Sequence, residues 1–480
     1  MPTFRSLLLV LLVAPAIAFS QTTRTLTVDP VPDDAPDQGC TLREAVDVAN
    51  AGLLDALGCA ASESGSGLPV TYQLTLPAYE YFLTGAADDD ENLSGDLDVQ
   101  VPIVLAGQGA QLTVLNGGQV DRVLDLVVAS AAVTAEHLTI TGGNAPDGGG
   151  VAQSGGTLSL TNVVIEGNQS SGRGGGVFTD NGILTLDQCV IRGNQAQEGG
   201  GLMTHNGLDL RRSTVAENTA FDGAGIHIRD GLSTISGSTL EGNVATARGG
   251  GVFIQENLGA RLAISGSAVV NNEAGTGGGG IYSRGGVRPE VDIANSTIAG
   301  NSALRDGGGM ASSNTQLTNV TVVNNSAGGA GGGVSGSRFS TVVANSLIAG
   351  NLSSSAAPDC SGVIQSGGFN LIGINSGCVS EFPGGNPNPN QDIVGTAAIP
   401  LEPLLRPVSG DPAFREPAGN SPAVDRIPET SCRFLARPWN PLYAVGELVA
   451  TDQRGLARDA LCDIGAIESD VLFADGFEIP

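Results

Sequence analysis

The sequence predicts an all-β protein whose chain winds into a right-handed parallel β-helix, with a helical cap at the N-terminal end and an irregular module at the C-terminal end. Two observations predict this fold. A run of glycines followed by one aliphatic residue recurs eight times between Gly148 and Val334, at steps of 24 to 29 residues. An asparagine recurs at nearly the same steps, in phrases such as STLEGN and STIAGN. A period of this size indicates one small structural unit that is stacked on itself.

The segment GGGVFTDNGILTLDQCVIRGN, Gly174 to Asn194, shows how one unit is built. Val177 begins an alternating stretch, DNG is a turn signal, ILTL alternates again, and CVI leads into a Gly-Asn corner. We therefore expect three strands and three corners in each coil. Strands of about 3 to 5 residues need parallel pairing with the next coil, about 4.8 Å away. The right-handed sense follows from the rule for crossovers between parallel strands.

Both recurring columns are expected to be structural, because recurrence in every coil suits a scaffold and not a single active site. The aliphatic residues point inward, and the glycines before them occupy corners where positive φ or close approach of two coils leaves no room for a Cβ. Asparagine tolerates the left-handed region, and a stacked amide donates to one neighbouring coil while it accepts from the other. The predicted asparagine ladder consists of Asn168, Asn194, Asn218, Asn243, Asn272, Asn301, Asn325 and Asn351.

Changes in composition divide the chain into six segments. Residues 1–20 are typical of an export signal, with Arg5, the apolar run LLLVLLVA and a small-residue cleavage site at Ala16-Ile17-Ala18. Residues 21–66 form the cap, where TLREAVDVANAGLL is amphipathic, and residues 67–138 form irregular first coils. Regular coils occupy residues 139–380, and a proline-rich module occupies residues 381–468. Residues 469–480 are a tail of the FADGFE type, either a sorting tag or an end that packs two aromatic rings.

Cysteine spacing and charge fit an exported protein. Proximity in the sequence predicts three disulfides, Cys40–Cys59, Cys360–Cys378 and Cys432–Cys462, and leaves Cys189 in the core. The net charge of −27, with arginine as the sole basic side chain besides three histidines, disfavours nucleic acid as a partner. No apolar run after the signal is long enough to span a bilayer. The oligomeric state is not specified by these features.

Three parts of the chain resemble known families. Val28 to Ala51, with Cys40-Thr41-Leu42-Arg43-Glu44-Ala45, resembles the CSLREA domain of bacterial surface and secreted proteins, with Thr41 in place of serine, and SGDLDV and DRVLDL are similar to the same group. GGFNLIG, GNSPAVD, DQRG and CDIGAIE resemble the choice-of-anchor Q domain. The middle is similar to the repeats of polymorphic outer-membrane proteins. These resemblances imply an exported right-handed parallel β-helix, often pectin-lyase-like, and no established catalytic activity.

The residues just before the glycine runs form a column of alternating charge, with Asp147, Arg173, Glu198, Asp222 and Arg248. Opposite charges at strand spacing stabilise each other by about 0.2–1 kcal/mol per pair, which favours a solvated ion-pair ladder. The alternative takes arginine as the base and the acids as calcium ligands of a polysaccharide lyase. Alternation favours the ladder, because a lyase needs its acids clustered.

A second column, one residue after each inward aliphatic residue, is expected to face outward. Its large side chains are Phe178, Met203, His227, Phe253 and Tyr282. Exposed rings would form a platform for the faces of sugars and make this stripe a glycan-binding candidate. The alternative is that a flanking segment, such as IQENLGARL, covers the stripe.

The acidic residues before the regular coils are the metal-site candidate. They are Asp88, Asp89, Asp90, Asp96 and Asp98, whose oxygens suit calcium. Their spacing is not that of an EF-hand loop, so a solvated acidic turn is the alternative. No other cofactor is expected, because the three histidines fall at unrelated positions in the coils and support neither zinc nor a Ser-His-Asp arrangement.

Two classes of function remain. The first is an exported or cell-surface scaffold, adhesin-like and non-enzymatic, that presents a long face to polysaccharide or other surface components. The second is a carbohydrate-active enzyme on the same scaffold, either a lyase or a two-carboxylate hydrolase. The fold alone does not decide between them. A groove on a long face where three or more acids converge would favour the enzyme. A purely structural envelope protein would not differ from an adhesin in sequence.

Overall fold

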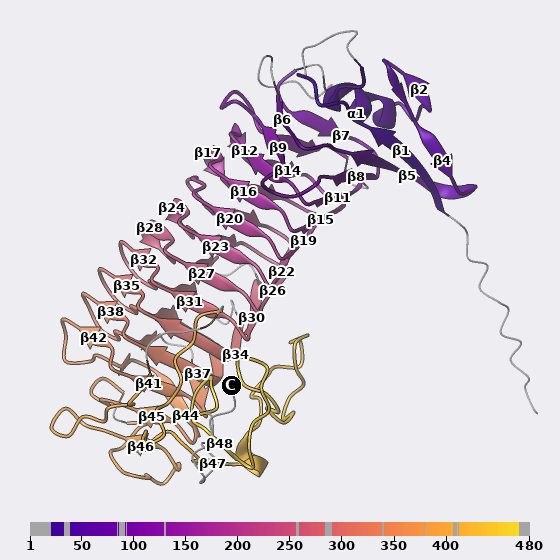
Figure 1. Ribbon diagram of the computed structural model, residues 1–480. Coiled ribbons are helices and arrows are strands. Elements are labelled where there is room, and N and C mark those ends of the chain that lie inside the picture. Colours follow the sequence, from indigo (N-terminus) through magenta and orange to yellow (C-terminus); the bar gives the residue numbers. More distant parts are fainter. Residues whose placement is uncertain are drawn as a thin grey trace, which may run out of the picture.

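The computed structural model describes residues 21–32, 39–83, 85, 92, 94–128, 131–255, 259–283, 290–337, 340–378, 380–406, 410 and 412–469. These residues form a long stack of parallel coils (Figure 1), which confirms the all-β solenoid class. The right-handed sense stays a prediction. The expected export signal, and residues 470–480 of the tail, lie outside the described part of the chain.

Three sheets run along the stack, and their strands pair in parallel except for β4, which is antiparallel to β1. Sheet 1 comprises β1 (Gln21–Thr27), β4 (Ser62–Ser64), β5 (Gly67–Thr75), β6 (Tyr79–Phe82), β8 (Ile103–Ala106), β9 (Thr113–Asn116), β11 (Ala132–Glu136), β12 (Thr139–Thr141), β15 (Thr157–Thr161), β16 (Val164–Glu166), β19 (Ile183–Asp187), β20 (Val190–Arg192), β22 (Leu208–Arg211), β23 (Thr214–Ala216), β26 (Leu232–Ser236), β27 (Thr239–Glu241), β30 (Arg261–Ser265), β31 (Ala268–Val270), β34 (Glu290–Ala299), β37 (Thr315–Val323), β40 (Thr341–Ala344), β41 (Leu347–Ala349), β44 (Ile364–Gly368), β45 (Leu371–Ile372) and β46 (Ile393–Val394). Most coils give it two consecutive strands, which fuse in β34 and β37.

Sheet 2 has 11 strands, one from each coil. They are β7 (Leu97–Val99), β10 (Leu124–Leu126), β14 (Val151–Gln153), β18 (Val177–Thr179), β21 (Leu202–Thr204), β25 (Ile226–Ile228), β29 (Val252–Ile254), β33 (Ile281–Ser283), β36 (Met310–Ser312), β39 (Val334–Gly336) and β43 (Cys360–Ser361).

Sheet 3 is made of short strands that follow the asparagine column: β13 (Asn144–Asp147), β17 (Gln169–Arg173), β24 (Thr219–Asp222), β28 (Val244–Arg248), β32 (Glu273–Ala274), β35 (Ser302–Ala303), β38 (Ser326–Ala327) and β42 (Leu352–Ser353). Single bridges through Gln195 and Glu198 join its two parts. Each regular coil therefore has four short segments, and the expected number of three was wrong. The fourth segment escaped the sequence analysis because its buried positions hold alanine, as at Ala220 and Ala245, which gives a weak apolar alternation.

The inward aliphatic column fills the interior of the stack, as predicted. Its members have no exposed surface: Val151, Val177, Leu202, Ile226, Val252, Ile281, Met310 and Val334. Each is paired in register with its equivalent one coil away in sheet 2, for example Val177 with Leu202. Burial of this column, together with the inward aliphatic residues of sheet 1 such as Leu186 and Ile191, stabilises the repeats.

The glycine runs meet two separate physical requirements. Gly174 has φ +61°, so it occupies the left-handed region that residues with a Cβ rarely adopt. Gly175 lacks space instead, because a Cβ there would lie 2.4 Å from the carbonyl oxygen of Gly200 in the next coil. A glycine run thus turns the chain and lets two coils approach closely.

The asparagine ladder is confirmed by its hydrogen bonds. The Oδ1 of Asn218 accepts from the backbone N–H and the Nδ2 of Asn194, both at 3.0 Å. The Nδ2 of Asn218 donates onward to Asn243 Oδ1 at 2.9 Å and back to the carbonyl of Ile191 at 3.0 Å. The left-handed residue is the one before each ladder asparagine, such as Gly193 or Glu217, and not the asparagine itself. This corrects the conformational part of the prediction: the amide is buried because it serves the ladder, and its neighbour makes the turn.

A second ladder of serines runs between the two strands that each coil gives to sheet 1. The backbone N–H of Cys189 donates to Ser213 Oγ, that of Ser213 to Ser238, and that of Ser238 to Ser267. The core position predicted for Cys189 is confirmed, and burial raises the pKa of its thiol to about 11. The serine in phrases such as STLEGN was the available signal for this ladder.

The asparagine ladder ends on a carboxylate. Asp359 Oδ1 accepts from the N–H and Nδ2 of Asn351 at 3.0 and 2.9 Å, and its Oδ2 accepts from the N–H of Ile374 at 2.7 Å. An acceptor-only side chain suits this place, because all three facing groups are donors. Burial is the main cause that raises the pKa of Asp359 to about 6 from 3.8.

We expect this carboxyl to make stability fall as pH rises. The folded pKa lies above the unfolded value, so the stabilising contribution is full below pH 4 and is lost as pH rises to about 6. Two pKa units correspond to about 3 kcal/mol. Urea unfolding between pH 4 and 7 should show the difference between the wild type and Asp359→Asn, which does not titrate, shrinking by up to this amount. A difference that is constant or grows with pH would contradict the prediction.

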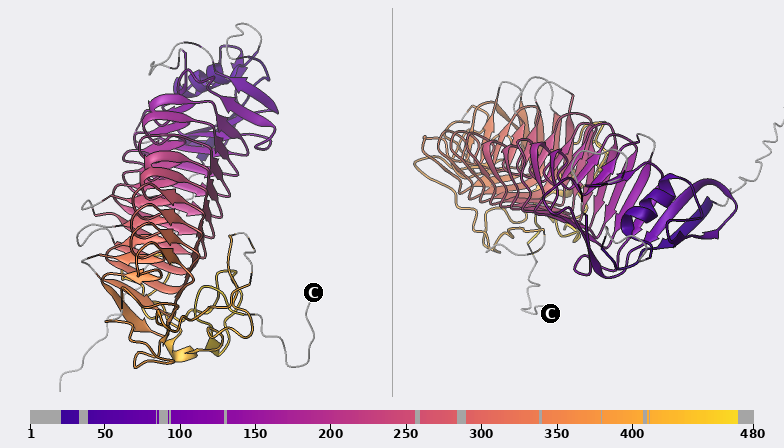
Figure 2. Two further views of the ribbon diagram at one scale, coloured as in Figure 1. Left: turned by 90° about the vertical axis from the view of Figure 1, so that its left-hand side faces the viewer. Right: turned by 90° about the horizontal axis from the view of Figure 1, so that it is seen from above.

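The N-terminal end is covered by α1 (Leu42–Asn50) and by β1, which pairs with β5 (Figure 2). Thr41 and Glu44 form a capping box at the start of α1. The Cys40–Cys59 disulfide fixes the preceding loop to the short hairpin of β2 (Asp55–Ala56) and β3 (Cys59–Ala60). Among the described residues, no helix is both long enough and apolar enough to cross a membrane.

The C-terminal module lies against the outer face of sheet 1, on the side opposite sheet 3 (Figure 1). Arg437 donates to Asp292 Oδ1 at 2.8 Å, and Gln453 accepts from Thr297 at 2.6 Å. The module contains one antiparallel pair, β47 (Ile427–Pro428) with β48 (Leu461–Cys462), and a short 3-10 helix (Glu429–Ser431). The disulfides Cys360–Cys378 and Cys432–Cys462 confirm the remaining predicted pairs.

Candidate functional site

The charge column forms two separate ion pairs and not a continuous ladder. Arg173 donates to both oxygens of Asp147, at 3.0 and 2.6 Å, and Arg248 does the same to Asp222, at 3.1 and 2.7 Å. Within the described part of the chain, Glu198 makes no ion pair. The hydrogen bond from each arginine to its aspartate raises the pKa of the arginine. A lyase base needs the opposite shift, so this geometry favours the structural interpretation of the column.

The predicted glycan-binding stripe is largely buried. Phe178 is 8% exposed, whereas Met203, His227 and Phe253 are each 1% exposed, and only Tyr282 is partly open. Exposure of the stripe, one of the two alternatives, is therefore wrong for four of its five members, and the other alternative, a covered stripe, holds for them. Any binding role for the stripe stays a prediction.

The arginines of the charge column cover the stripe. The guanidinium of Arg173 lies 4.4 Å from the ring centre of Phe178, and that of Arg248 lies 4.6 Å from Phe253. The first glycine of each run also folds the chain back over the column, since a Cβ on Gly223 would lie 2.9 Å from the Cβ of His227. Burial lowers the pKa of His227 to about 4, and Gln255, at the start of IQENLGARL, lies 3.1 Å from its Nε2.

Two of the five metal candidates meet a third acid in the structure. Asp98 in β7 and Asp125 in β10 are paired in register, one coil apart, and Asp96 lies just before β7. One carboxylate oxygen from each of the three lies within 4.8 Å of the others. Asp88, Asp89 and Asp90 lie outside the described residues. The sequence analysis missed Asp125, whose signal was the similarity of SGDLDV and DRVLDL.

The N-terminal cap holds the loop that carries this acidic group. Arg43, from the CTLREA motif, donates to the carbonyl oxygens of Asp96 at 2.6 Å and Gly95 at 2.8 Å. The backbone N–H of Asn92 donates to Asp98 Oδ2 at 2.7 Å, and Asn50 of α1 donates to the carbonyl of Asp98 at 2.7 Å. Helix α1 therefore positions the loop through backbone groups.

Burial and the neighbouring negative charges both raise the pKa of Asp96 in the acidic group. Asp96, Asp98 and Asp125 are 2%, 0% and 6% exposed. Burial, and then the neighbouring charges of Asp121 and Asp98, raise the pKa of Asp96 to about 8. Arg122 is the cation placed against the group, with Nε 3.2 Å from Asp96 Oδ2 and an ion pair to Asp125. Among the described residues, no other set of three potential ligands lies as close together.

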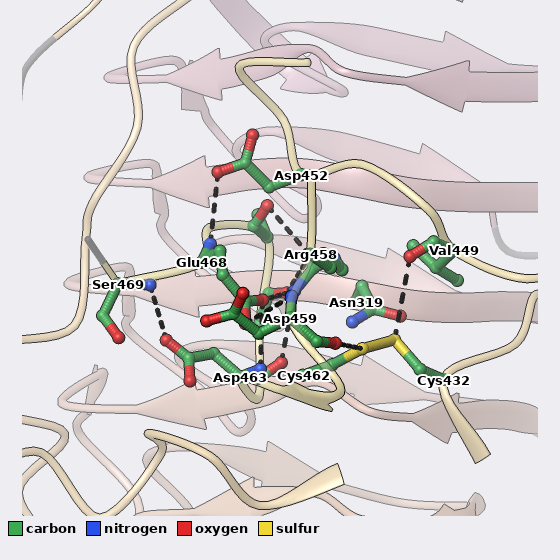
Figure 3. Close-up of polar contacts among 12 residues, drawn as sticks. Asn319, Cys432, Val449, Asp452, Arg458, Asp459, Cys462, Asp463, Glu468 and Ser469 are labelled. Carbon is green, nitrogen blue, oxygen red and sulfur yellow. Dashed lines mark hydrogen bonds and ion pairs between the residues drawn. A yellow bond between two sulfur atoms is a disulfide. The ribbon is translucent and has the colours of Figure 1, made fainter. Parts of the chain in front are cut away.

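A buried arginine organises the C-terminal module (Figure 3). The side chain of Arg458 is 1% exposed, and its Nη1 donates to Glu468 Oε2 at 2.8 Å. Its Nη2 donates to Asn295 Oδ1 at 3.2 Å, and this bond ties the module to sheet 1. The same nitrogen donates to the carbonyl of Gly465, within the module, at 3.0 Å. Glu468 and Asp463 belong to the CDIGAIE motif, and burial raises the pKa values of both, that of Glu468 to about 7. This arrangement fixes a fold and offers no open coordination position.

The outer face of sheet 3 is the long exposed surface of the repeats. Two outward columns alternate with the buried alanines. They contain Asn144, Gln169, Gln195, Thr219, Val244, Glu273, Ser302, Ser326 and Leu352, and Pro146, Ser171, Gln197, Phe221, Thr246, Gly275, Leu304, Gly328 and Ser354. Glu273 is the one charged side chain in these columns. Phe221 is 54% exposed and Leu304 is 71% exposed. A shallow hollow of about 530 Å³ lies over β32, β35, β38 and β42.

Sequence reasoning missed this face because it searched for exposed rings in the column of sheet 2 and did not recognise the strands of sheet 3. Phe221 lies one residue before Asp222 and points outward, whereas Phe178 and Phe253 lie under the arginines. No protein-family model and no curated protein sequence matches the chain. The resemblance to CSLREA and choice-of-anchor proteins is therefore an expectation from the sequence motifs alone.

Proposed function

We propose that this protein is an exported, non-enzymatic scaffold that presents the outer face of sheet 3 to an uncharged polysaccharide at or outside the cell surface. One observation carries the proposal: a long exposed face holds amide, hydroxyl and apolar side chains and almost no charge, although the chain has a net charge of −27. Hydroxyl and amide groups match the hydrogen-bonding groups of sugars, and exposed apolar side chains match their C–H faces.

The dimensions of the face favour a polymer. The columns run from β13 to β42, which is eight steps of about 4.8 Å, or roughly 40 Å. A surface of this length and flatness contacts several sugar units at once and distinguishes a chain from a monosaccharide. The negative net charge makes acidic polysaccharides poor partners, because they would be repelled.

Export is supported by three disulfides, which persist in oxidising compartments, and by the signal-like residues 1–20. The resemblance to CSLREA and choice-of-anchor proteins supports the same placement. The enzyme alternative receives less support, because the three acids that converge are buried beside the N-terminal cap and not set in the face of sheet 3.

A glycan array with the purified mature chain tests the proposal. We expect uncharged polysaccharides to bind and short sugars to bind weakly. Phe221→Ala should weaken binding of the best polysaccharide by about 3- to 10-fold, since one stacked ring contributes about 0.5–1.5 kcal/mol. Ile183→Ala is the matched control, because Ile183 is 60% exposed on sheet 1. Equal losses in both variants, or no binding by the wild type, would count against the proposed face.

A further inference from the structure

The three carboxylates beside the N-terminal cap have the dimensions of a single cation site. Their ligand atoms lie within 4.8 Å of one another. Calcium is bound by oxygens at 2.3–2.6 Å, so two oxygens on opposite sides of one ion lie about 5 Å apart. This spacing is compatible with one ion among Asp96, Asp98 and Asp125 once the guanidinium of Arg122 has moved away.

An unsatisfied atom supplies a second and independent observation. Asp96 Oδ1 is buried and has no hydrogen-bond partner among the residues that the structure describes, although Oδ2 of the same side chain lies near Arg122. The side chain of Asp96 is 3% exposed, so this oxygen is not in contact with bulk solvent. A buried carboxylate oxygen without a donor is costly, and a cation would satisfy it directly.

We propose that Asp96, Asp98 and Asp125 bind one divalent cation, calcium in preference to magnesium, at the junction between the N-terminal cap and the first coils. The ligands are all carboxylate oxygens on a loop and two strands, an irregular set that calcium accepts. Magnesium requires a near-octahedral shell and keeps several waters, which a buried site accommodates poorly.

The surroundings hold the ligands in place before the ion arrives. Arg43 fixes the carbonyls of Gly95 and Asp96, and Asn92 fixes one oxygen of Asp98, so the loop is positioned independently of the ion. A bound ion would connect the loop to β7 and β10, and through Arg43 to α1. Its structural effect is to secure the cap on the first coil.

Arg122 is the competing cation. It lies against the carboxylates of Asp96 and Asp125, and four aspartates, including Asp121, surround this one guanidinium. Calcium entry requires the guanidinium to turn away from the group. Removal of Arg122 should therefore raise calcium affinity, whereas a purely structural ion pair predicts a destabilised chain that calcium does not rescue.

Calorimetric titration of the EDTA-treated mature chain with calcium chloride, and in parallel with magnesium chloride, tests the site. We expect one calcium ion per chain and a rise in melting temperature of about 2–5 °C at saturating calcium. Asp96→Asn and Asp125→Asn should each weaken calcium binding at least 10-fold. Asp187→Asn is the matched control, because it removes a carboxylate paired with Arg212 on sheet 1.

Arg122→Gln provides a test that does not depend on loss of binding. We expect this variant to bind calcium more tightly than the wild type and to recover its melting temperature when calcium is added. The proposal is overturned if the wild type binds no calcium at millimolar concentration, or if Asp96→Asn and Asp125→Asn bind as tightly as Asp187→Asn. It is also overturned if magnesium binds more tightly than calcium, or if calcium does not stabilise Arg122→Gln.

Discussion

Asn243→Ala is expected to destabilise the repeats by about 2–6 kcal/mol. The substitution removes the acceptor for two buried donors, the N–H and Nδ2 of Asn218, at 3.1 and 2.9 Å. It also removes the donor to the carbonyl of Val215 and the donor to Asn272 Oδ1. Each buried group left without a partner costs about 1–3 kcal/mol. Urea unfolding followed by far-UV circular dichroism measures the loss, and hydrogen exchange locates it in the affected coils.

Two further variants make this prediction specific to the ladder. Gln195→Ala changes an exposed side chain directly after a ladder asparagine and should cost less than about 0.5 kcal/mol. The double variant Asn218→Ala, Asn243→Ala should cost clearly less than the sum of the single variants, because each removes a partner of the same hydrogen bond. Additive losses, or an Asn243→Ala variant as stable as Gln195→Ala, would show that the ladder does not act as a connected network.

Arg458→Met is expected to release the C-terminal module from sheet 1. The substitution leaves the buried carboxylate of Glu468 without its arginine, and removal of one member of a buried ion pair costs about 3–5 kcal/mol. It also removes the hydrogen bond to Asn295 that joins the module to β34. Limited proteolysis and hydrogen exchange should show new cleavage and faster exchange within residues 412–469, while the coils before β34 keep their protection.

A second substitution in the Arg458–Glu468 pair should restore part of the stability that Arg458→Met removes. Glu468→Gln in the Arg458→Met background removes the uncompensated charge and should recover part of the lost stability. Arg426→Met, which changes an exposed arginine of the same module, is the matched control. Protection of residues 412–469 that is unchanged in Arg458→Met, or no recovery in the double variant, would mean that the other contacts of the module, such as Arg437 with Asp292, hold it on sheet 1 without the buried pair.

The expected and observed exposure of side chains differ most where the charge column lies beside the large side chains of sheet 2. The sequence places Phe178 and Phe253 on the outward side of sheet 2, which is correct, but alternation does not state what lies above that side. Arg173 and Arg248 reach over the rings from the adjacent corner, and the glycine turn folds back across the column. Phe221, which lies in β24 of sheet 3, points away from this corner and stays exposed.

The acidic group of Asp96, Asp98 and Asp125 shows that the sequence also did not reveal which candidate metal ligands lie together. Asp96 and Asp98 are close in sequence and were identified as metal candidates, but their third partner, Asp125, comes from the next coil. Residues a coil apart become neighbours only through the register of parallel strands, which aligns Asp98 with Asp125. The similar phrases SGDLDV and DRVLDL indicate this register, but the pairing can be recognised only when the length of the coil between them is known.

Proximity of the cysteines in the sequence sufficed to predict the three disulfides. What the sequence alone determined beyond these is most of the repeating framework, although it missed the strands of sheet 3 and the serine ladder: the solenoid fold, the inward aliphatic column and the asparagine ladder. These features can be predicted because each coil imposes the same steric and hydrogen-bonding requirement, so the same sequence pattern recurs in every regular coil. The tertiary structure alone decided which outward side chains are covered, how the C-terminal module lies on sheet 1, and which acids converge beside the cap. Those outcomes depend on particular contacts between segments that are distant in sequence, such as Arg458 with Asn295, and such contacts leave no periodic pattern in the chain.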